Sequence, residues 1–331
     1  MSTTTAAQGS NPGLTNTMQI WYDKNFLDRA KNELRHDFGA QVRSVPMNSG
    51  KTVYFTRFSP LAVATTALSE AVNPTAVDMT AATVSATLAD YGAYVTVGSL
   101  YSMTSIEEGL TEHVSVIGQQ AGETIDTLIR NELVSANSYS GATGTLVQIP
   151  AGATALSTIH TTDTFTGVEV RRAVRTLKNN KAQKFENGLF RGIINQWSAM
   201  DLMGNSEWLD AHRYTTADAI ERGVVGKLHG VEFVETNNPY VALSAGFSTS
   251  ATNVANVNSN FIFGKNAYGV INLGSIRAPK VYVKNPGANS TDNPIDQFST
   301  IGWKMPFAVK TLNANWIVHI RCGATDSYNA G

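Results

Sequence analysis

The segment from Val77 to Leu100, VDMTAATVSATLADYGAYVTVGSL, restricts the possible folds of this chain more than any other. It carries two charged residues, Asp78 and Asp90, and its small apolar and hydroxyl side chains alternate. Such alternation is typical of strands with one covered face, and Tyr91-Gly92 predicts a bend. With the strand-like stretch that begins at Lys51, the segment predicts a long two-stranded ribbon. A ribbon of this kind has no core of its own, so other residues must cover it.

The composition indicates what covers the ribbon. Charged residues make up 15% of the 331 residues, against about 25% in an ordinary soluble domain. A chain that hides much of its surface against copies of itself needs fewer charges than a free monomer. The net charge of -1 gives no general indication of nucleic acid or of an anionic membrane as a partner. The length is sufficient for at least one substantial core.

The chain has one cysteine, Cys322, which excludes an intramolecular disulfide framework and favours synthesis in a reducing compartment. No apolar run approaches the roughly 18 residues of a membrane span. The start, MSTTTAAQGSNPG, lacks the basic and apolar regions of a secretory signal. We therefore expect a flexible polar arm at the start of a soluble protein made in the cytoplasm.

Apolar spacing predicts three main helices. The first covers residues 18–38 and is ended by Gly39. The second runs from the capping box Thr104-Ser-Ile-Glu107 to Ala136 and contains glycines at 109, 118 and 122, which are costly in a helix unless another backbone packs closely. The third begins at the capping box Thr166-Gly-Val-Glu169.

The rest of the chain alternates between strand-like and short helix-like pieces. LFRGIINQW, GKLHGVEFVETNNP, NFIFGKNAYGVINL and KVYVK are strand-like, SAMDLMG and TTADAIERG are helix-like, and MPFAVKTLNANWIVHIRC predicts two closing strands. The fold class is α+β, with one unusually long helix and one unusually long ribbon.

Motifs for chemistry are absent from the sequence. NSGKT at residues 48–52 is similar to the end of a phosphate-binding loop, but Val45 stands where that loop needs glycine and a strand follows. Glu107-Glu108 suits the start of a helix, and Cys322 has no histidine beside it in the sequence. No pair of histidines has metal-ligand spacing; they are His36, His113, His160, His212, His229 and His319. We predict no catalytic residue, no metal site and no cofactor.

One basic helix face is the remaining candidate for binding. Arg171, Arg172, Arg175 and Lys178 lie along one side of the third helix. A solvated face is the default interpretation, and contact with acidic residues of a neighbouring subunit or with packaged nucleic acid is the alternative.

The order of parts resembles the major capsid proteins of tailed bacteriophages, which share the Hong Kong 97 fold with herpesvirus capsid floors and encapsulin shells. SEAVNPTAVDMTAATVSATLADYGAYVTVGSL is similar to the returning arm of the family's E-loop, and GKLHGVEFVETNNP to its A-domain strand pair. IGWKMPFAVKTLNANWIVHI is similar to the strands that return to its P-domain. In that fold each E-loop lies across a neighbouring subunit, which would cover the ribbon.

The resemblance implies a division of the chain into five parts. They are an N-terminal arm at 1–50, the E-loop at 51–98, the P-domain with its spine helix at 99–163, the A-domain at 164–275, and P-domain return strands at 276–331. Charged residues on the ribbon and the third helix are then candidate inter-subunit contacts: Arg57, Glu70, Asp78, Arg171 and Arg175.

The implied function is a structural protein whose copies form hexamers and pentamers of an icosahedral shell around double-stranded DNA, in a virion assembled in the host cytoplasm. The short region before the first helix implies a separate scaffolding protein. A portal protein, a possible decoration protein, and weak, non-specific contact with the DNA are further expected partners, and no membrane is expected.

Some family members join an E-loop lysine to an asparagine of a neighbour. The chain has no lysine between Lys51 and Lys178, so we expect no such bond to Asn285, Asn289 or Asn293. Two alternatives stay open: an encapsulin-type compartment with the same fold, and a β-rich carbohydrate-active or adhesive protein. The latter would need clustered carboxylates, which the sequence does not offer.

Overall fold

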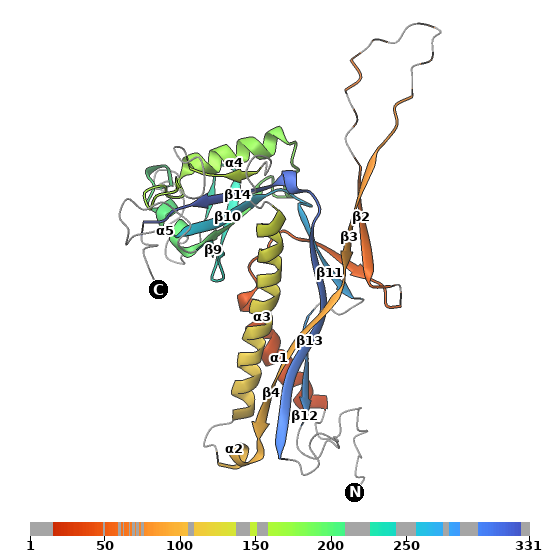
Figure 1. Cartoon of the computed structure of the whole chain (residues 1–331), viewed down its shortest axis with the longest axis vertical. Coiled ribbons are helices and arrows are strands. Elements are labelled where there is room, and N and C mark those ends of the chain that lie inside the picture. Colours follow the sequence, from red (N-terminus) through yellow and green to blue (C-terminus); the bar gives the residue numbers. More distant parts are fainter. Residues whose placement is uncertain are drawn as a thin grey trace.

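The computed structural model describes most of the chain. The described residues are 16–48, 50–58, 61, 63–65, 67, 70, 73, 76–104, 109–136, 146–150, 158–208, 226–242, 256–273, 278–284 and 297–325. They form an elongated stem, a lobe at one end of the stem, and a ribbon that leaves the stem beside the lobe (Figure 1). This arrangement agrees with the expected α+β class.

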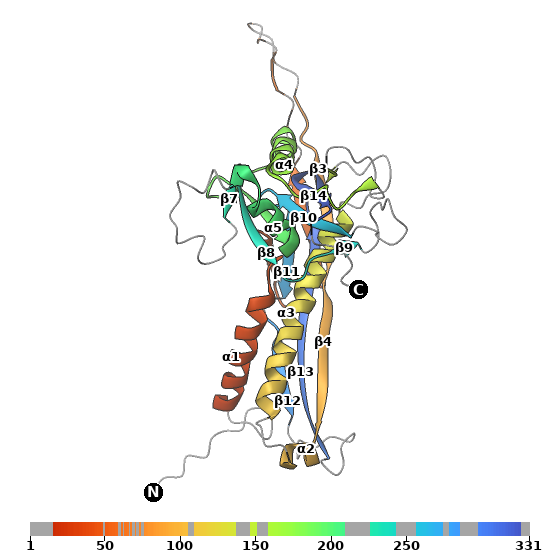
Figure 2. The same ribbon diagram turned by 90° about the vertical axis from the view of Figure 1, so that its left-hand side faces the viewer.

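The stem is a five-stranded sheet covered on one face by two helices. The long strand β13 pairs with β11 and β12 along one edge and with β4 along the opposite edge. The strand β1 pairs with β11 and completes the sheet. The strands are β1 (Gln41–Val45), β4 (Ala89–Gly98), β11 (Tyr268–Leu273), β12 (Lys280–Lys284) and β13 (Phe298–Thr311). The helices are α1 (Asn16–Glu33) and α3 (Gly109–Ala136), and the short α2 (Ser99–Thr104) follows β4. Figure 2 shows α1 beside α3.

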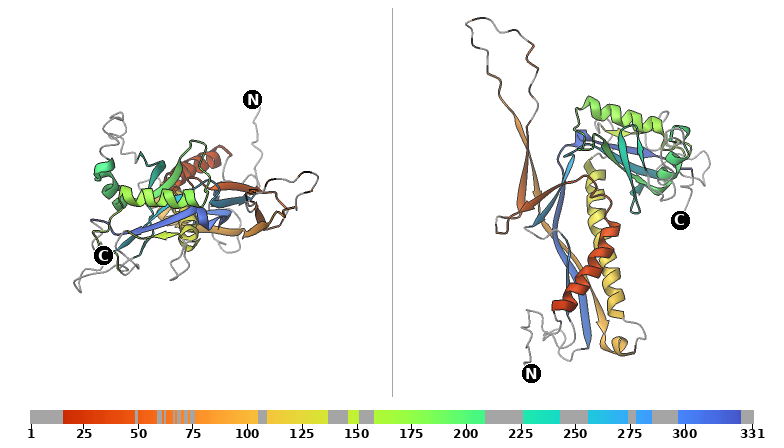
Figure 3. Two further views of the ribbon diagram at one scale, coloured as in Figure 1. Left: turned by 90° about the horizontal axis from the view of Figure 1, so that it is seen from above. Right: turned by 180° about the vertical axis from the view of Figure 1, so that it is seen from behind.

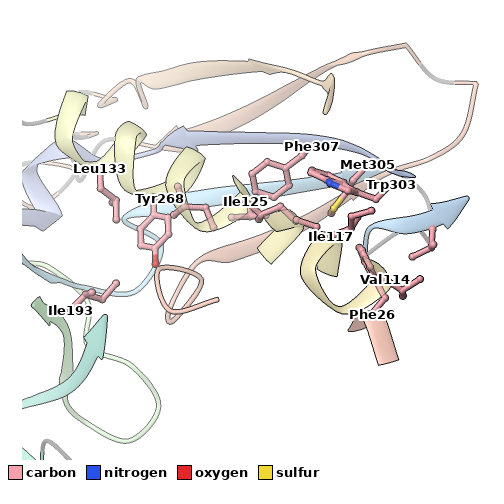
Figure 4. Close-up of a cluster of buried hydrophobic side chains, with 14 of the residues drawn as sticks. Phe26, Val114, Ile117, Ile125, Leu133, Ile193, Tyr268, Trp303, Met305 and Phe307 are labelled. Carbon is pink, nitrogen blue, oxygen red and sulfur yellow. The ribbon is translucent and has the colours of Figure 1, made fainter. Parts of the chain in front are cut away.

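The stem core lies between the helices and the sheet. Phe26 of α1 and Ile117 and Ile125 of α3 pack in one cluster with Trp303 and Phe307 of β13 (Figure 4). The core residues of β13 are two apart, which is the period expected of a strand with one face on a core. The indole Nε1 of Trp303 also donates a hydrogen bond to Gln120, at 3.3 Å.

The two helices approach each other closely at two glycines of α3. A Cβ atom at Gly118 would lie 2.9 Å from the carbonyl oxygen of Phe26, and one at Gly122 would lie 2.5 Å from that of Ala30. Both distances are too short for a real Cβ atom. The prediction that glycine in this helix allows another backbone to pack closely is confirmed at these two positions.

The lobe is a seven-stranded sheet with two helices on one face. Its strands are ordered β5-β14-β10-β6-β8-β7, with β9 also paired to β10. The strands are β5 (Val147–Gln148), β6 (Phe190–Asn195), β7 (Lys227–Leu228), β8 (Val231–Thr236), β9 (Val241–Ala242), β10 (Val257–Phe263) and β14 (Ile317–Cys322). The helices are α4 (Gly167–Asn179) and α5 (Gln196–Met203), and a 3-10 turn at Ala314–Trp316 precedes β14. Figure 3 shows the lobe from above and from behind.

The ribbon is the antiparallel pair β2 (Thr52–Phe58) and β3 (Ala81–Thr87). It begins immediately after the turn at Asn48 and Gly50, where both residues have positive φ. The prediction that NSGKT is a turn before a strand is confirmed for the described residues of that motif.

Four local expectations were wrong. The first helix ends at Glu33, and a turn at residues 36–39 includes Gly39. The strand β4 runs unbroken through Tyr91-Gly92, and the break in the returning arm lies at Leu88. Thr104 is the last residue of α2, where its hydroxyl donates to the carbonyl of Leu100, and α3 begins at Gly109. Thr166 does precede α4, but its side chain makes no capping hydrogen bond, and Glu169 pairs with Arg172. The predicted capping partner Glu107 and the helix-like TTADAIERG lie outside the described residues.

Candidate assembly surfaces

The base of the ribbon is anchored on the outer face of the stem sheet. Phe55 and Ala86 are 5% and 4% exposed and pack against Ile271 of β11 and Ala308 of β13. The helices cover the alternate residues of the same strands, such as Phe307, so the ribbon base lies on the opposite face. Arg43 of β1 places its guanidinium 4.8 Å from the centre of the Phe55 ring, which secures the ribbon further.

Beyond this base, the ribbon exposes large apolar side chains that no described part of the chain covers. Tyr54 and Phe58 of β2 are 62% and 63% exposed, and Val77 and Met79 before β3 are also exposed. Apolar side chains of this size, gathered on one projecting element, mark a surface that another molecule covers. The exposed apolar side chains make the ribbon a candidate surface for contact with another molecule.

A second uncovered surface lies on the outer face of the stem sheet. The side chains of Tyr94 and Tyr282 are exposed here, and a groove of about 500 Å³ runs beside them over Gly302. A Cβ atom at Gly302 would lie 2.8 Å from the Cβ of Tyr94, so glycine lets the tyrosine lie against the sheet. Lys304 and Asp90 form an exposed ion pair at 2.9 Å, which raises the pKa of Lys304 through hydrogen bonding and charge.

Sequence reasoning did not single out the tyrosines of this surface. The signal was present in β4, where Ala93 and Val97 pack toward the helices and Tyr94 falls on the alternate face. A large aromatic residue on the uncovered side of a strand is the informative observation.

The structure places the predicted contact residues in two groups. Arg57, Glu70 and Asp78 are exposed on the ribbon and its extension. Arg175 is exposed on α4, whereas Arg171 forms an ion pair at 3.0 Å with Glu207 of the same chain. Glu207 also lies 3.0 Å from His229. The structure therefore does not bring the five residues together, and Arg171 has a partner within the lobe.

The junction of stem and lobe is a buried polar network. Oδ1 of Asp126 in α3 accepts hydrogen bonds from the backbone N–H groups of Arg35 and His36, and Oδ2 lies 2.8 Å from the His36 ring. Asn238, which follows β8, donates to Asp126 at 3.3 Å and to Thr127 at 2.8 Å. Four hydrogen bonds to Asp126 and a fifth to Thr127 thus join the turn after α1 and the lobe to one point of the stem helix.

The described residues offer no catalytic or metal site. Among them, no group of three or more histidine, cysteine, aspartate or glutamate residues is arranged to hold a metal ion. Cys322 is buried at the end of β14, and burial raises the pKa of its thiol to about 12. A thiol held in this protonated form is a poor nucleophile. The interpretation of Cys322 as a small core residue of the last strand is confirmed.

Comparison with known proteins identifies the family. Residues 35–278 match a family described as phage capsid protein. The chain belongs to this family. The matched region includes the ribbon, α3 and most of the lobe.

Solved phage capsids share the fold of this family member. The capsid of Ralstonia phage GP4 has a TM-score of 0.69 and 12% identity and covers 88% of both chains. The capsid of cyanophage Pam1 has a TM-score of 0.64 and 16% identity over 98% of this chain and 99% of its own. The capsid of cyanophage P-SCSP1u has a TM-score of 0.60 and 14% identity over 86% of each chain. No curated protein matches the sequence.

These findings confirm the resemblance that the sequence indicated. The chain is a phage major capsid protein with the Hong Kong 97-like fold, a structural component of the virion that assembles with other copies into a shell, and not an enzyme. The carbohydrate-active alternative is therefore wrong. Within the described residues, no helix is both long enough and apolar enough to cross a membrane.

Proposed function

We propose that copies of this capsid protein form hexamers and pentamers of an icosahedral shell around double-stranded DNA, and that the ribbon of each copy lies across a neighbour. The observation that carries the proposal is the ribbon itself. Its base is buried at Phe55 and Ala86, while Tyr54 and Phe58 are exposed. The outer face of the stem sheet around Tyr94 offers a second exposed surface for contact between copies.

The division into an N-terminal arm at 1–50, an E-loop at 51–98, an A-domain at 164–275 and a P-domain in the remainder is part of this proposal. Pairing of β4 with β13 supports a shorter free portion, because residues 89–98 belong to the stem sheet. The projecting part of the E-loop then covers about 52–87. Arg57, Glu70, Asp78 and Arg175 are proposed inter-subunit contacts, and Arg171 contributes less because Glu207 already neutralises it.

The proposed partners are a separate scaffolding protein, a portal protein, the packaged DNA, and a decoration protein in some assemblies, with assembly in the host cytoplasm. Weak DNA contact is supported by charge. The net charge is -1, and two arginines of the basic face of α4 pair with carboxylates of the same chain. Strong binding to DNA depends on several free cations.

The test replaces residues 65–80 with a short Gly-Ser turn, which removes the outer part of the ribbon and keeps the paired strands. Because none of the described residues of this part belongs to the stem core or to the cluster at the ribbon base, we expect the subunit to keep its unfolding midpoint and to lose particle formation. Thermal unfolding and negative-stain imaging with the scaffolding protein measure the two effects.

Ile117→Asp in α3 is the matched control. It places an unpaired charge in the stem core, where Ile117 is 3% exposed, and should destabilise the subunit by several kcal/mol. If the shortened ribbon unfolds the subunit as severely as this substitution, or if it leaves particle formation intact, the proposal fails.

A further inference from the structure

Two polar side chains lie together on the lobe face opposite α4 and α5. Ser259 of β10 and Arg321 of β14 are directly opposed in the antiparallel pair, so their side chains are neighbours on one face. Ile320 and Cys322, on either side of Arg321, belong to the core beneath α4 and α5, which assigns Arg321 to the other face. Figure 1 shows β14 and β10 extending away from the stem at this point.

Both side chains are buried, and neither has a hydrogen-bond partner in the described part of the chain. Ser259 is 3% exposed and Arg321 is 7% exposed. The hydroxyl of Ser259 and the Nε–H of Arg321 have no hydrogen-bond partner among the described residues, and no ion pair joins Arg321 to a described carboxylate. The phenol of Tyr240 is the polar neighbour that acts on the guanidinium, and burial lowers the pKa of Arg321. A buried cation in this situation is costly.

Among the described residues, no carboxylate forms an ion pair with Arg321. Another arginine of the lobe, Arg191, also has an Nε–H without a hydrogen-bond partner, but its guanidinium lies 4.2 Å from the ring centre of Phe38 and 4.3 Å from that of Phe185. The guanidinium of Arg191 therefore has aromatic ring contacts within the chain, and the described residues provide no such contact for Arg321.

We infer that Arg321 and Ser259 form a receptor for a carboxylate side chain of a second copy of this chain. Both groups present hydrogen-bond donors, and a carboxylate is an acceptor-only group that matches a guanidinium. One recessed guanidinium suits a single side chain, whereas a nucleic acid backbone is bound by several accessible cations. The inference rests on the proposed assembly and adds a specific contact to it.

The first test compares Arg321→Met with Arg191→Met in the full chain. Arg321→Met removes an unpaired buried charge, so the unfolding midpoint of the unassembled subunit should stay equal to or rise above that of the wild type. Association into particles should weaken on the order of tenfold or more, as expected when one member of a buried pair is lost. Arg191→Met should lower the subunit midpoint, because its ring contacts lie within the chain.

Two results of this comparison overturn the inference. One is a subunit midpoint of Arg321→Met lowered as far as that of Arg191→Met, since the guanidinium would then have a partner in its own chain. The other is unchanged association of Arg321→Met. If the wild type assembles in the same experiment, unchanged association of Arg321→Met contradicts the proposed Arg321 contact but not the proposed shell function.

The second test identifies the carboxylate. Arg321→Lys introduces an amine that a carbodiimide joins to a nearby carboxylate with loss of water, forming an amide; wild-type Arg321 does not react in this way. In particles, mass spectrometry should show the peptide containing position 321 joined to an acidic residue of another copy, and this product should be absent from unassembled subunits. A link to the same chain, or no link at position 321 in particles, overturns the inference.

Discussion

The imidazole Nδ1 of His36 lies 2.8 Å from Oδ2 of Asp126, and both side chains are closed to solvent. This pair joins the turn after α1 to the middle of α3. Asn238 of the lobe donates to the same carboxylate oxygen, and the hydroxyl of Tyr268 donates to the backbone carbonyl of His36 at 2.6 Å. One carboxylate therefore links α1, α3 and the lobe, alongside the hydrophobic cluster that includes Ile193 and Phe261 of the lobe.

Asp126→Asn should destabilise the subunit by about 3 kcal/mol, the usual cost of breaking one side of a buried pair. Chemical denaturation at pH 7 measures the change. Asp28→Asn, on the exposed side of α1, is the control and should stay within about 0.5 kcal/mol of wild type. Equal effects of the two substitutions would contradict the role given to Asp126.

The pair also predicts an acid dependence. Burial alone would raise the pKa of Asp126, but hydrogen bonds and charge from His36, with backbone donors, lower it below 3.8. A carboxyl with a lowered folded pKa stabilises the fold above its unfolded pKa, and this contribution is lost as the pH falls through the folded value. Wild type should therefore lose stability below about pH 4, and Asp126→Asn should lose less over that range. Burial raises the pKa of the neighbouring Asp37. Its contribution to stability therefore increases as the pH falls, opposite to that of Asp126.

Gly122→Ala should destabilise the subunit although alanine is the better helix former. The added Cβ would lie 2.5 Å from the carbonyl oxygen of Ala30, and overpacking of this kind costs about 1–3 kcal/mol. Gly204→Ala is the matched control, because its nearest neighbour would be 3.5 Å away. Thermal unfolding should show a lower midpoint for Gly122→Ala alone. A gain in stability at Gly122 would show that α1 does not pack there.

Phe55 and Phe58 lie three residues apart on β2 and should respond differently to substitution. Phe55→Ala removes a side chain from the cluster at the ribbon base and should cost about 3 kcal/mol. Phe58→Ser changes a side chain that is 63% exposed, so subunit stability should be unchanged while particle yield falls. Unfolding curves and particle counts on both variants separate the two roles. A loss of stability in Phe58→Ser would show that Phe58 packs within its own subunit.

Mature particles boiled in detergent should run as one band near 35 kDa, the mass of the single chain. The sequence has no lysine between Lys51 and Lys178, so the projecting ribbon has no amine for an isopeptide bond. The candidate asparagines Asn285, Asn289 and Asn293 lie outside the described residues. Covalent ladders that persist under reducing conditions would contradict the prediction.

Cys322 should resist thiol reagents in the native protein. Its pKa is raised to about 12 and its side chain is fully buried, so almost no thiolate is present or accessible at pH 8. Labelling with a chromogenic disulfide should proceed only after addition of denaturant. Rapid labelling of the folded subunit would show that β14 opens readily.

Local sequence patterns were sufficient to predict several elements of the fold. Apolar spacing found α1, α3 and α4, and alternation found the ribbon and the closing strands. Glycine at 118 and 122 in a long helix predicted a closely packed backbone, which α1 supplies. The ribbon segment has few charges and alternating apolar residues. These features predicted a surface covered by another chain, because a two-stranded ribbon has no core of its own.

The tertiary structure alone decided how distant segments combine. The sequence predicted that residues 89–98 belong to the ribbon, but they form β4 and pair with residues 298–307 of β13. No local pattern encodes a partner about 200 residues away in the chain. Asp126 and His36, as well as Ser259 and Arg321, meet for the same reason. Strand order and register are set by the total burial of the core and by satisfaction of every buried backbone group, which are properties of the whole fold and not of any one segment.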